Sequence, residues 1–77
     1  MTVKEARYVR VGDPIKAGID LRNPETMEVV VPRMTIGKVG SIDRRPSDPM
    51  IYFSCLWELR QGTHQADIPA RDAYRHQ

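Results

Sequence analysis

Met50–Leu59 has the sequence MIYFSCLWEL, and this stretch decides the fold class. Apolar side chains occupy every second position of it, at Ile51, Phe53, Cys55 and Trp57. A period of two is the pattern of a β-strand with one apolar face. The stretch also holds the only Trp and the only Phe of the chain. We therefore expect a long central strand around which the core is organised.

Shorter strands are indicated on either side of this stretch. They are expected at Ile15–Leu21, Met27–Val31, Met34–Asp43 and His64–Ile68. Turn residues separate the strands at intervals of about ten residues, a spacing typical of an all-β barrel or sandwich. A helical turn is expected at Thr2–Arg7, where Thr2 and Glu5 have the spacing of a capping box. Another is expected at Pro69–Tyr74, which begins with a proline.

Loop and glycine positions indicate where the chain turns. Ile15–Leu21 and Met27–Val31 flank the polar loop Arg22–Thr26, which predicts a hairpin. Gly18 indicates a bulge or a close approach of two backbones. The two glycines within Met34–Asp43 indicate a sharply bent or bulged strand, as small barrels use at their corners.

The chain has 77 residues, the length of one small domain, 1–77, and we expect residues 1–7 and 75–77 to be flexible. A core of this size stabilises a fold only marginally. A single cysteine excludes an internal disulfide, and the scattered Cys55, His64 and His76 lack the spacing of a zinc motif. We predict no metal and no cofactor, and a partner or a second copy remains a source of stability.

Charge is spread evenly along the chain. There are 12 Lys and Arg against 10 Asp and Glu, a net charge of +2, without charge runs. This pattern is typical of a solvated surface, whereas nucleic-acid binders more often show a basic stripe. The first residues lack the apolar segment of a signal peptide, and no run is long enough to span a bilayer. With one free cysteine, these features predict a cytoplasmic protein without a membrane partner.

The order of elements resembles an SH3-like small barrel. The turn Val11-Gly12-Asp13 follows a short apolar segment, a bent strand covers Pro32–Asp43, and the chain closes with DIPARDAY at Asp67–Tyr74. The resemblance implies a barrel of about five strands. An inserted hairpin and a short C-terminal helical turn complete the expected fold.

More narrowly, the chain resembles the YodC-like small bacterial proteins of unknown function. The matching residues are Val11–Asp13, Pro32–Ile36, Tyr52–Trp57 and Ile68–Ala70. Relative to that pattern Ile19–Val31 is an inserted hairpin, Phe53-Ser54 replaces a tighter Tyr-Cys spacing, and Ile68 stands where a Phe is usual. The resemblance implies a fold and no known chemistry.

No catalytic constellation is visible in the sequence. Cys55 shares a strand face with the aromatic core residues, so we expect a buried, inert thiol. His64 and Asp67 are three residues apart, and in a strand such positions point to opposite faces. Paired carboxylates, a glycine-rich phosphate loop and a serine elbow are missing. We predict that the protein is not an enzyme and has no catalytic residues.

Two surfaces are candidates for binding a protein. Met27, Val29 and Val30 belong to an apolar strand, and an exposed β-branched edge invites pairing with another chain. Tyr52 and Leu56 lie on the face of the central strand opposite Trp57, and a mixed face of this kind suits a partner or a dimer interface. The alternative for both surfaces is coverage within the domain itself.

We therefore predict a non-catalytic interaction module that binds a protein partner, with a homodimer as a further alternative. This function rests on fold-level analogy. Small accessory proteins of this kind are often regulators or inhibitors, and some are encoded by phages or mobile elements.

Two alternatives stay open. The first is a nucleic-acid-binding barrel in which Lys38, Arg44, Arg45 and Tyr52 contact phosphate and a stacked base. The second is an oligomeric enzyme whose site forms only at a symmetry axis, as in the SH3-like type II dihydrofolate reductases. The sequence lacks a recognisable copy of their cofactor-binding strand motif.

Overall fold

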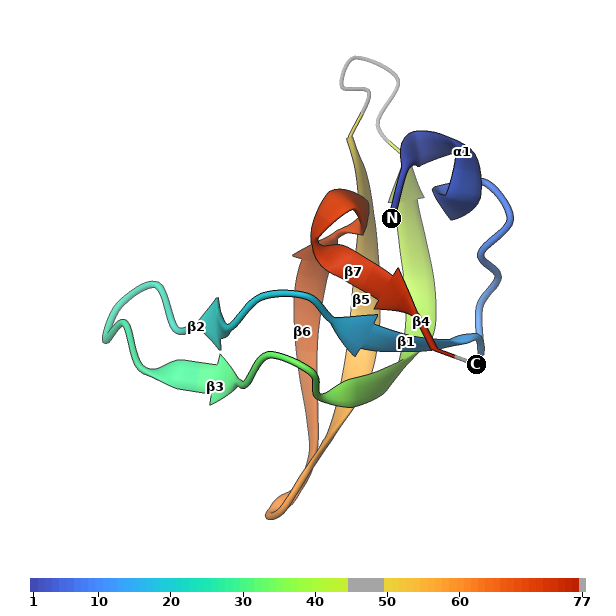
Figure 1. Ribbon diagram of the computed structural model, residues 1–77. Helices are drawn as coiled ribbons and strands as arrows, with labels where there is room; N and C mark the ends of the chain where they lie inside the picture. Colours follow the sequence, from blue (N-terminus) through green and yellow to red (C-terminus); the bar gives the residue numbers. More distant parts are fainter. Residues whose placement is uncertain (45–49, 77) are drawn as a thin grey trace.

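The computed structural model describes residues 1–44 and 50–76 and shows a mostly β fold (Figure 1). One short helical turn and one 3-10 turn accompany the strands. The elements are α1 (Val3–Ala6), β1 (Pro14–Ala17), β2 (Leu21–Arg22), β3 (Val29–Val31), β4 (Ile36–Arg44), β5 (Ile51–Leu59), β6 (Gly62–Pro69), the 3-10 turn η1 (Ala70–Asp72) and β7 (Ala73–Arg75). The all-β prediction is confirmed.

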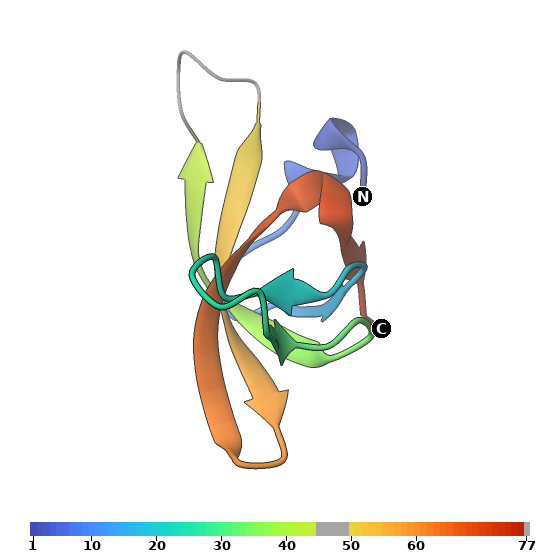
Figure 2. The ribbon, with the colours of Figure 1, turned by 90° about the vertical axis from the view of Figure 1, so that its left-hand side faces the viewer.

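Five strands form one antiparallel sheet in the order β6-β5-β4-β1-β7. β2 and β3 pair only with each other and form a separate hairpin, as the sequence predicted. β6 and β7 are the two outer strands, and within the described residues they do not pair with each other. The sheet is therefore strongly wrapped, as the two views show, but is not closed into a barrel (Figures 1 and 2).

The core lies against the inner face of β5. Phe53, Cys55 and Trp57 are fully buried there, as their alternation predicted. Ile15 from β1 and Ile68 from β6 are also fully buried and belong to the same cluster. The Trp57 indole Nε1–H donates a hydrogen bond of 3.1 Å to the Ala66 carbonyl, which satisfies its polar atom within the core.

Two glycines allow close packing in this core. A Cβ added to Gly37 would lie 2.6 Å from Cε3 of the Trp57 ring. A Cβ added to Gly18 would lie 2.5 Å from the Asp72 carbonyl oxygen, which accepts the Gly18 N–H at 2.7 Å. The close backbone approach predicted at Gly18 is thus present, and it ties β1 to η1.

The strand predicted before the hairpin is shorter than expected. The sequence predicted one strand over Ile15–Leu21, whereas β1 ends at Ala17. The chain bends at Gly18 and Ile19, and Leu21 then pairs with Val31 in the hairpin. The Gly18 N–H donates to the Asp72 carbonyl in register with the Ala17–Ala73 pair, and the chain turns away from the sheet after this bond.

The bulge predicted in the bent strand is present in β4. The register with β5 shifts between Val39 and Ser41, so that Gly40 is the extra residue. The shift keeps Val39 and Ile42 opposite Cys55 and Phe53, on the inner side of the sheet.

The N-terminal turn is held at both ends. The Glu5 N–H donates to Thr2 Oγ1 at 3.1 Å and the Thr2 N–H donates to Glu5 Oε1 at 3.2 Å, which confirms the capping box. Bonds from the Thr2 backbone and hydroxyl lower the pKa of the Glu5 carboxyl. In this 77-residue chain the Met1 amino group donates to the carbonyls of Ala70 and Ala73, beside η1. The flexibility of residues 1–7 and 75–77 stays a prediction.

Candidate functional site

The β2–β3 hairpin extends away from the main sheet (Figure 1). Its turn is organised by Asn23, whose side-chain Oδ1 accepts the Glu25 N–H at 2.8 Å. The Asn23 backbone N–H donates to the Glu28 carbonyl, and its carbonyl accepts the Met27 N–H. These local bonds define the hairpin tip without help from the sheet, which leaves the side chains of the tip available to solvent.

The valine run of β3 passes from solvent to core within three residues. Val29 is 39% exposed, Val30 is half-buried against the core cluster, and Val31 is fully buried. Met27, just before this run, is 61% exposed. The hairpin therefore presents Met27 and Val29 to solvent, while Val30 and Val31 attach the hairpin to the domain.

Two exposed methionines in this region have a left-handed backbone. Met27 has φ 62° and lies in the hairpin turn, and Met34 has φ 74° and lies between β3 and β4. This conformation costs a residue with a Cβ about 1–2 kcal/mol, and glycine or asparagine usually occupies it. Backbone strain of this kind is concentrated at functional sites, so the side chains of Met27 and Met34 are candidates for a binding role.

A groove separates the hairpin from the outer strand β6. Leu21, Arg22, Pro24 and Val30 line it on the hairpin side, and Gln65, Ala66 and Asp67 line it on the β6 side. Its volume is about 600 Å³. Figure 2 shows the hairpin passing in front of the upper part of β6, in agreement with these lining residues. Nothing in the sequence indicated this groove, because its two walls come from segments more than thirty residues apart.

The outer face of β5 carries the other predicted binding residues. Leu56 is 49% exposed and lies opposite Lys38 on one side and Gln65 on the other. Tyr52 is half-buried and lies opposite Asp43 and Pro69. Both side chains thus share one face, as predicted.

Sequence reasoning missed two exposed apolar residues at the far side of this face. Ile36 and Tyr74 are both paired with Lys16 of β1, so the three side chains form a row across the sheet. Ile36 is two residues before Lys38 in the same strand, so the alternation of β4 could have predicted that both side chains lie on the outer face. The sequence did not indicate Tyr74, because Tyr74 was expected in a helical turn.

The predicted nucleic-acid residues are only partly brought together. Lys38 and Tyr52 share the outer face, separated by four residues of strand or about 13 Å. Arg44 lies opposite Ile51, one position beyond the Asp43–Tyr52 pair, and so belongs to the other face. Asp43 places a carboxylate directly opposite Tyr52. Arg45 lies outside the described residues.

Cys55, His64 and Asp67 do not form a nucleophile–base–orienter set. In the β5–β6 ladder Cys55 lies opposite Ala66, while His64 and Asp67 lie opposite Trp57 and Ser54. Burial of the thiol, with a smaller contribution from the Asp67 charge, raises the pKa of Cys55 to about 12. A thiol that stays protonated in a closed core is a poor nucleophile.

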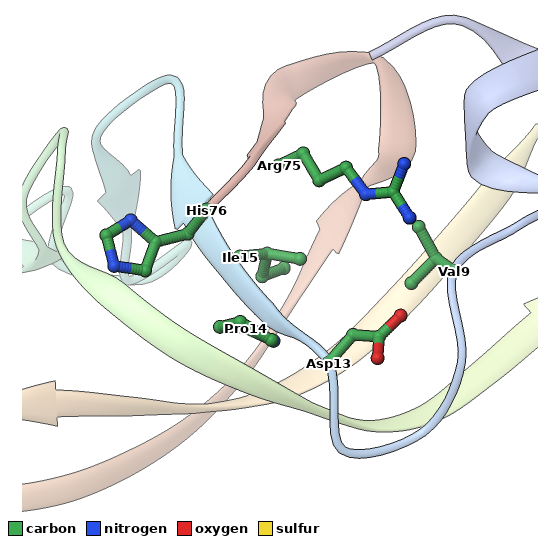
Figure 3. Close-up of a pocket in the computed structure, with 6 residues that line it drawn as sticks. All are labelled: Val9, Asp13, Pro14, Ile15, Arg75 and His76. Atoms are coloured by element: carbon green, nitrogen blue, oxygen red, sulfur yellow. The ribbon is translucent and has the colours of Figure 1, made fainter.

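A smaller hollow lies between β1 and the C-terminal segment (Figure 3). Its volume is about 160 Å³, with Val9, Pro14 and Ile15 as apolar walls. Asp13 and Arg75 point toward the Val9 side, and His76 lies on the other side of Ile15 (Figure 3). The Asp13 carboxylate already accepts the Arg10 N–H at 2.8 Å in a tight turn, so its main contact is structural.

The described part of the chain contains no cluster of His, Cys, Asp or Glu suited to a metal ion. Its one α-helical turn is far too short to cross a membrane. No protein-family model, curated protein or solved structure matches this chain.

Proposed function

We propose that this chain is a non-catalytic interaction module that binds a protein partner through the β2–β3 hairpin and through Tyr52 and Leu56 on the outer face of β5. Within this proposal the fold is SH3-like, as an open form of the barrel in which β6 and β7 do not pair. The support for that assignment is the strand order β6-β5-β4-β1-β7 together with the 3-10 turn between the last two strands. The YodC-like resemblance belongs to the same proposal, as does a cytoplasmic location.

The observation that carries the proposal is the exposure of Met27 and Val29 on a hairpin that pairs only with itself. Met27 is held with a positive φ, at a cost that a glycine would avoid. Methionine is adaptable and is frequent on binding surfaces. An exposed, strained methionine beside an exposed valine is better explained by a contact than by stability of the isolated chain.

The surface area of the chain is consistent with a partner. The chain exposes 5505 Å², whereas a compact monomer of 8.8 kDa exposes about 4,800 Å². The molecule is also flat, with extents of 32 × 28 × 17 Å. A flat shape offers a broad face for docking, and occupation of a partner's surface is how such a module would regulate or inhibit it.

The experiment compares capture by three immobilised forms of the chain from a lysate of cells that make it naturally, read by mass spectrometry. Met27→Asp/Val29→Asp places charge on the exposed hairpin. Val11→Asp is the matched control, because Val11 is an exposed apolar residue outside the proposed surface. We expect the wild type and the control to retain the same partner in stoichiometric amount and the hairpin variant to lose it. Equal retention by all three, or no stoichiometric partner, would contradict the proposal.

Binding of nucleic acid has less support, because Asp43 faces Tyr52 and Arg44 belongs to the other face of the sheet. Titration with single- and double-stranded oligonucleotides at low salt tests it directly, since phosphate-dominated binding is strongest there. Sedimentation analysis of the purified chain tests the homodimer, and a defined tetramer would favour the oligomeric enzyme.

A further inference from the structure

The free edge of β6 offers a more specific mode of binding. We infer that the groove between β6 and the hairpin accepts an extended segment of the partner protein as an added strand, with an apolar side chain toward the hairpin and a basic side chain beside Asp67. This inference rests on the proposed function and specifies the chemistry of the partner.

β6 is the longer and less protected of the two sheet edges. It runs for eight residues, Gly62–Pro69, and pairs only with β5. The other outer strand, β7, has only three residues. Edges are normally protected by lysine, proline, bulges or short length. Before its final Pro69, β6 contains no lysine, arginine or proline, so its backbone is open to pairing with an extended chain.

The backbone of β6 is held in place at Ala66, in the middle of this edge. The Ala66 carbonyl accepts the Trp57 indole N–H at 3.1 Å, which fixes the backbone of β6 to the core. Ala66 is small and half-buried, so it leaves room above it on the groove side. The groove, about 600 Å³ in volume, is shallow and open to solvent, so an extended segment could reach the backbone of β6 from outside.

The alternation of β6 dictates which side chains an added strand would meet. Ala66 pairs with Cys55 on the inner face, while Gln65 and Asp67 lie opposite Leu56 and Ser54 on the outer face. A residue placed opposite Ala66 would therefore point to the inner side. Leu21 and Val30 of the hairpin line that part of the groove. An apolar residue fits this position.

The next position of the added strand would lie beside the carboxylate of Asp67. Asp67 is exposed, and its carboxylate makes no hydrogen bond or ion pair with any described residue. In an added strand, a residue directly opposite Asp67 would lie on the same outer face, where opposite charges attract. Across the groove, Arg22 is tied to the hairpin by a 2.9 Å bond from its Nη1 to the Met27 carbonyl. The β6 wall is thus the acidic side of the groove, and it calls for lysine or arginine.

The test uses random heptapeptides displayed on phage and selected on three immobilised forms of the full chain. Asp67→Lys reverses the charge of the β6 wall. Glu58→Lys makes the same change on an exposed residue of β5 that does not line the groove. We expect wild type and Glu58→Lys to enrich peptides with lysine or arginine next to an apolar residue, and Asp67→Lys to enrich aspartate or glutamate at that position.

The strongest peptide is then synthesised and titrated. Its affinity should fall about tenfold or more on Asp67→Lys, as expected for like charges brought together, and stay unchanged on Glu58→Lys. Hydrogen exchange of the wild type with the peptide bound should slow for amides of β6. Three results would each overturn this inference. The selected peptides could lack a basic residue, the same peptides could be selected by Asp67→Lys, or no peptide could be enriched at all. The proposed function would still stand if the hairpin variant had lost its captured partner in the earlier experiment.

Discussion

On the inner face of β5, Phe53, Cys55 and Trp57 are all fully buried, whereas the hairpin strand β3 goes from an exposed to a buried valine within three residues. The β5 residues are in contact with strands on both sides, β4 and β6. The hairpin strands pair only with each other. The same kind of apolar, β-prone sequence therefore has two outcomes, and a side chain is buried where it faces the core cluster.

The backbone shows the same contrast. Close to Trp57 the chain uses a glycine where a Cβ would not fit, at Gly37. In the hairpin region it uses methionine at two positive-φ positions where glycine would be favoured. The first choice serves packing. The second works against stability, which is why we place the binding function in the hairpin and the stability of the domain around Trp57.

Loss of the Trp57 side chain is the largest expected effect. Trp57→Ala removes the largest buried side chain and its hydrogen bond to Ala66, and should cost about 3–5 kcal/mol, enough to unfold a domain of this size. Circular dichroism with urea denaturation measures it. Leu56→Ala, next to it on the exposed face, is the control and should change stability by less than about 0.5 kcal/mol. A folded Trp57→Ala protein would show that the core is centred elsewhere.

Gly37→Ala tests the packing against the Trp57 ring. The added methyl would lie 2.6 Å from Cε3 of Trp57 and 2.8 Å from the Leu56 carbonyl oxygen, and overpacking of this kind costs about 1–3 kcal/mol. Gly40→Ala is the matched control in the same strand, because its methyl would meet only the Ser54 carbonyl oxygen, at 3.2 Å. Thermal unfolding should rank the three proteins as wild type, Gly40→Ala and then Gly37→Ala. Equal stability of the two variants would mean that the ring does not rest on Gly37.

The sequence predicted best where local chemistry and the core agree. The alternation of β5 and the capping box of Thr2 and Glu5 both follow from rules that need only nearby residues. It predicted less well where a single tertiary contact redirects the chain. β1 ends at Ala17 and the chain bends at Gly18, beside η1, although the alternation itself continues to Leu21.

The binding surface was predictable only in part. Met27, Val29 and Leu56 are exposed as expected, and none of them belongs to the core cluster. The groove could not be predicted from the sequence, because it forms only where the tertiary fold brings Val30 and Asp67 close together. The bulge at Gly40 was foreseen, but its effect on Arg44 was not, because a one-residue shift moves every later side chain to the opposite face.

The titration of Cys55 tests whether the inner face of β5 is closed to solvent. Its thiol has an ordinary pKa of 9.0 that burial raises to about 12. Between these values the unfolded chain loses the thiol proton while the folded chain keeps it, so the free energy of unfolding falls as pH rises from 9 toward 12 and is unaffected below 9. The slope should approach about 1.4 kcal/mol per pH unit. Urea denaturation at pH 8 and 10 measures it.

Cys55→Ala is the control for this pH effect. The variant loses the titrating thiol but keeps every lysine and tyrosine, so its stability should fall less steeply above pH 9. Labelling with Ellman's reagent gives a second measurement, because the thiolate is the reactive form. The native chain should react only at the rate of unfolding. Rapid labelling of folded protein would show that Cys55 is open to solvent and would remove it from the core.

The smallest expected effect has the opposite sign and lies in the hairpin. Met27→Gly removes the Cβ from a residue with φ 62°, so the folded state should gain about 1 kcal/mol from relief of strain, offset in part by the greater freedom of glycine in the unfolded chain. Thermal unfolding should therefore show an equal or slightly higher midpoint. Met27→Asn, which tolerates the same backbone, separates relief of strain from loss of the side chain.

Both variants should at the same time lose the partner captured by the wild type, because our proposal assigns the binding to the methionine side chain. Stability kept or gained with binding lost is the signature of a residue retained for function at the expense of the fold. If Met27→Gly instead lowers the midpoint, the side chain packs against the hairpin and supports it. Met27 would then resemble Val31 and Trp57, and the division between a stabilising core and a binding hairpin would have to be drawn elsewhere.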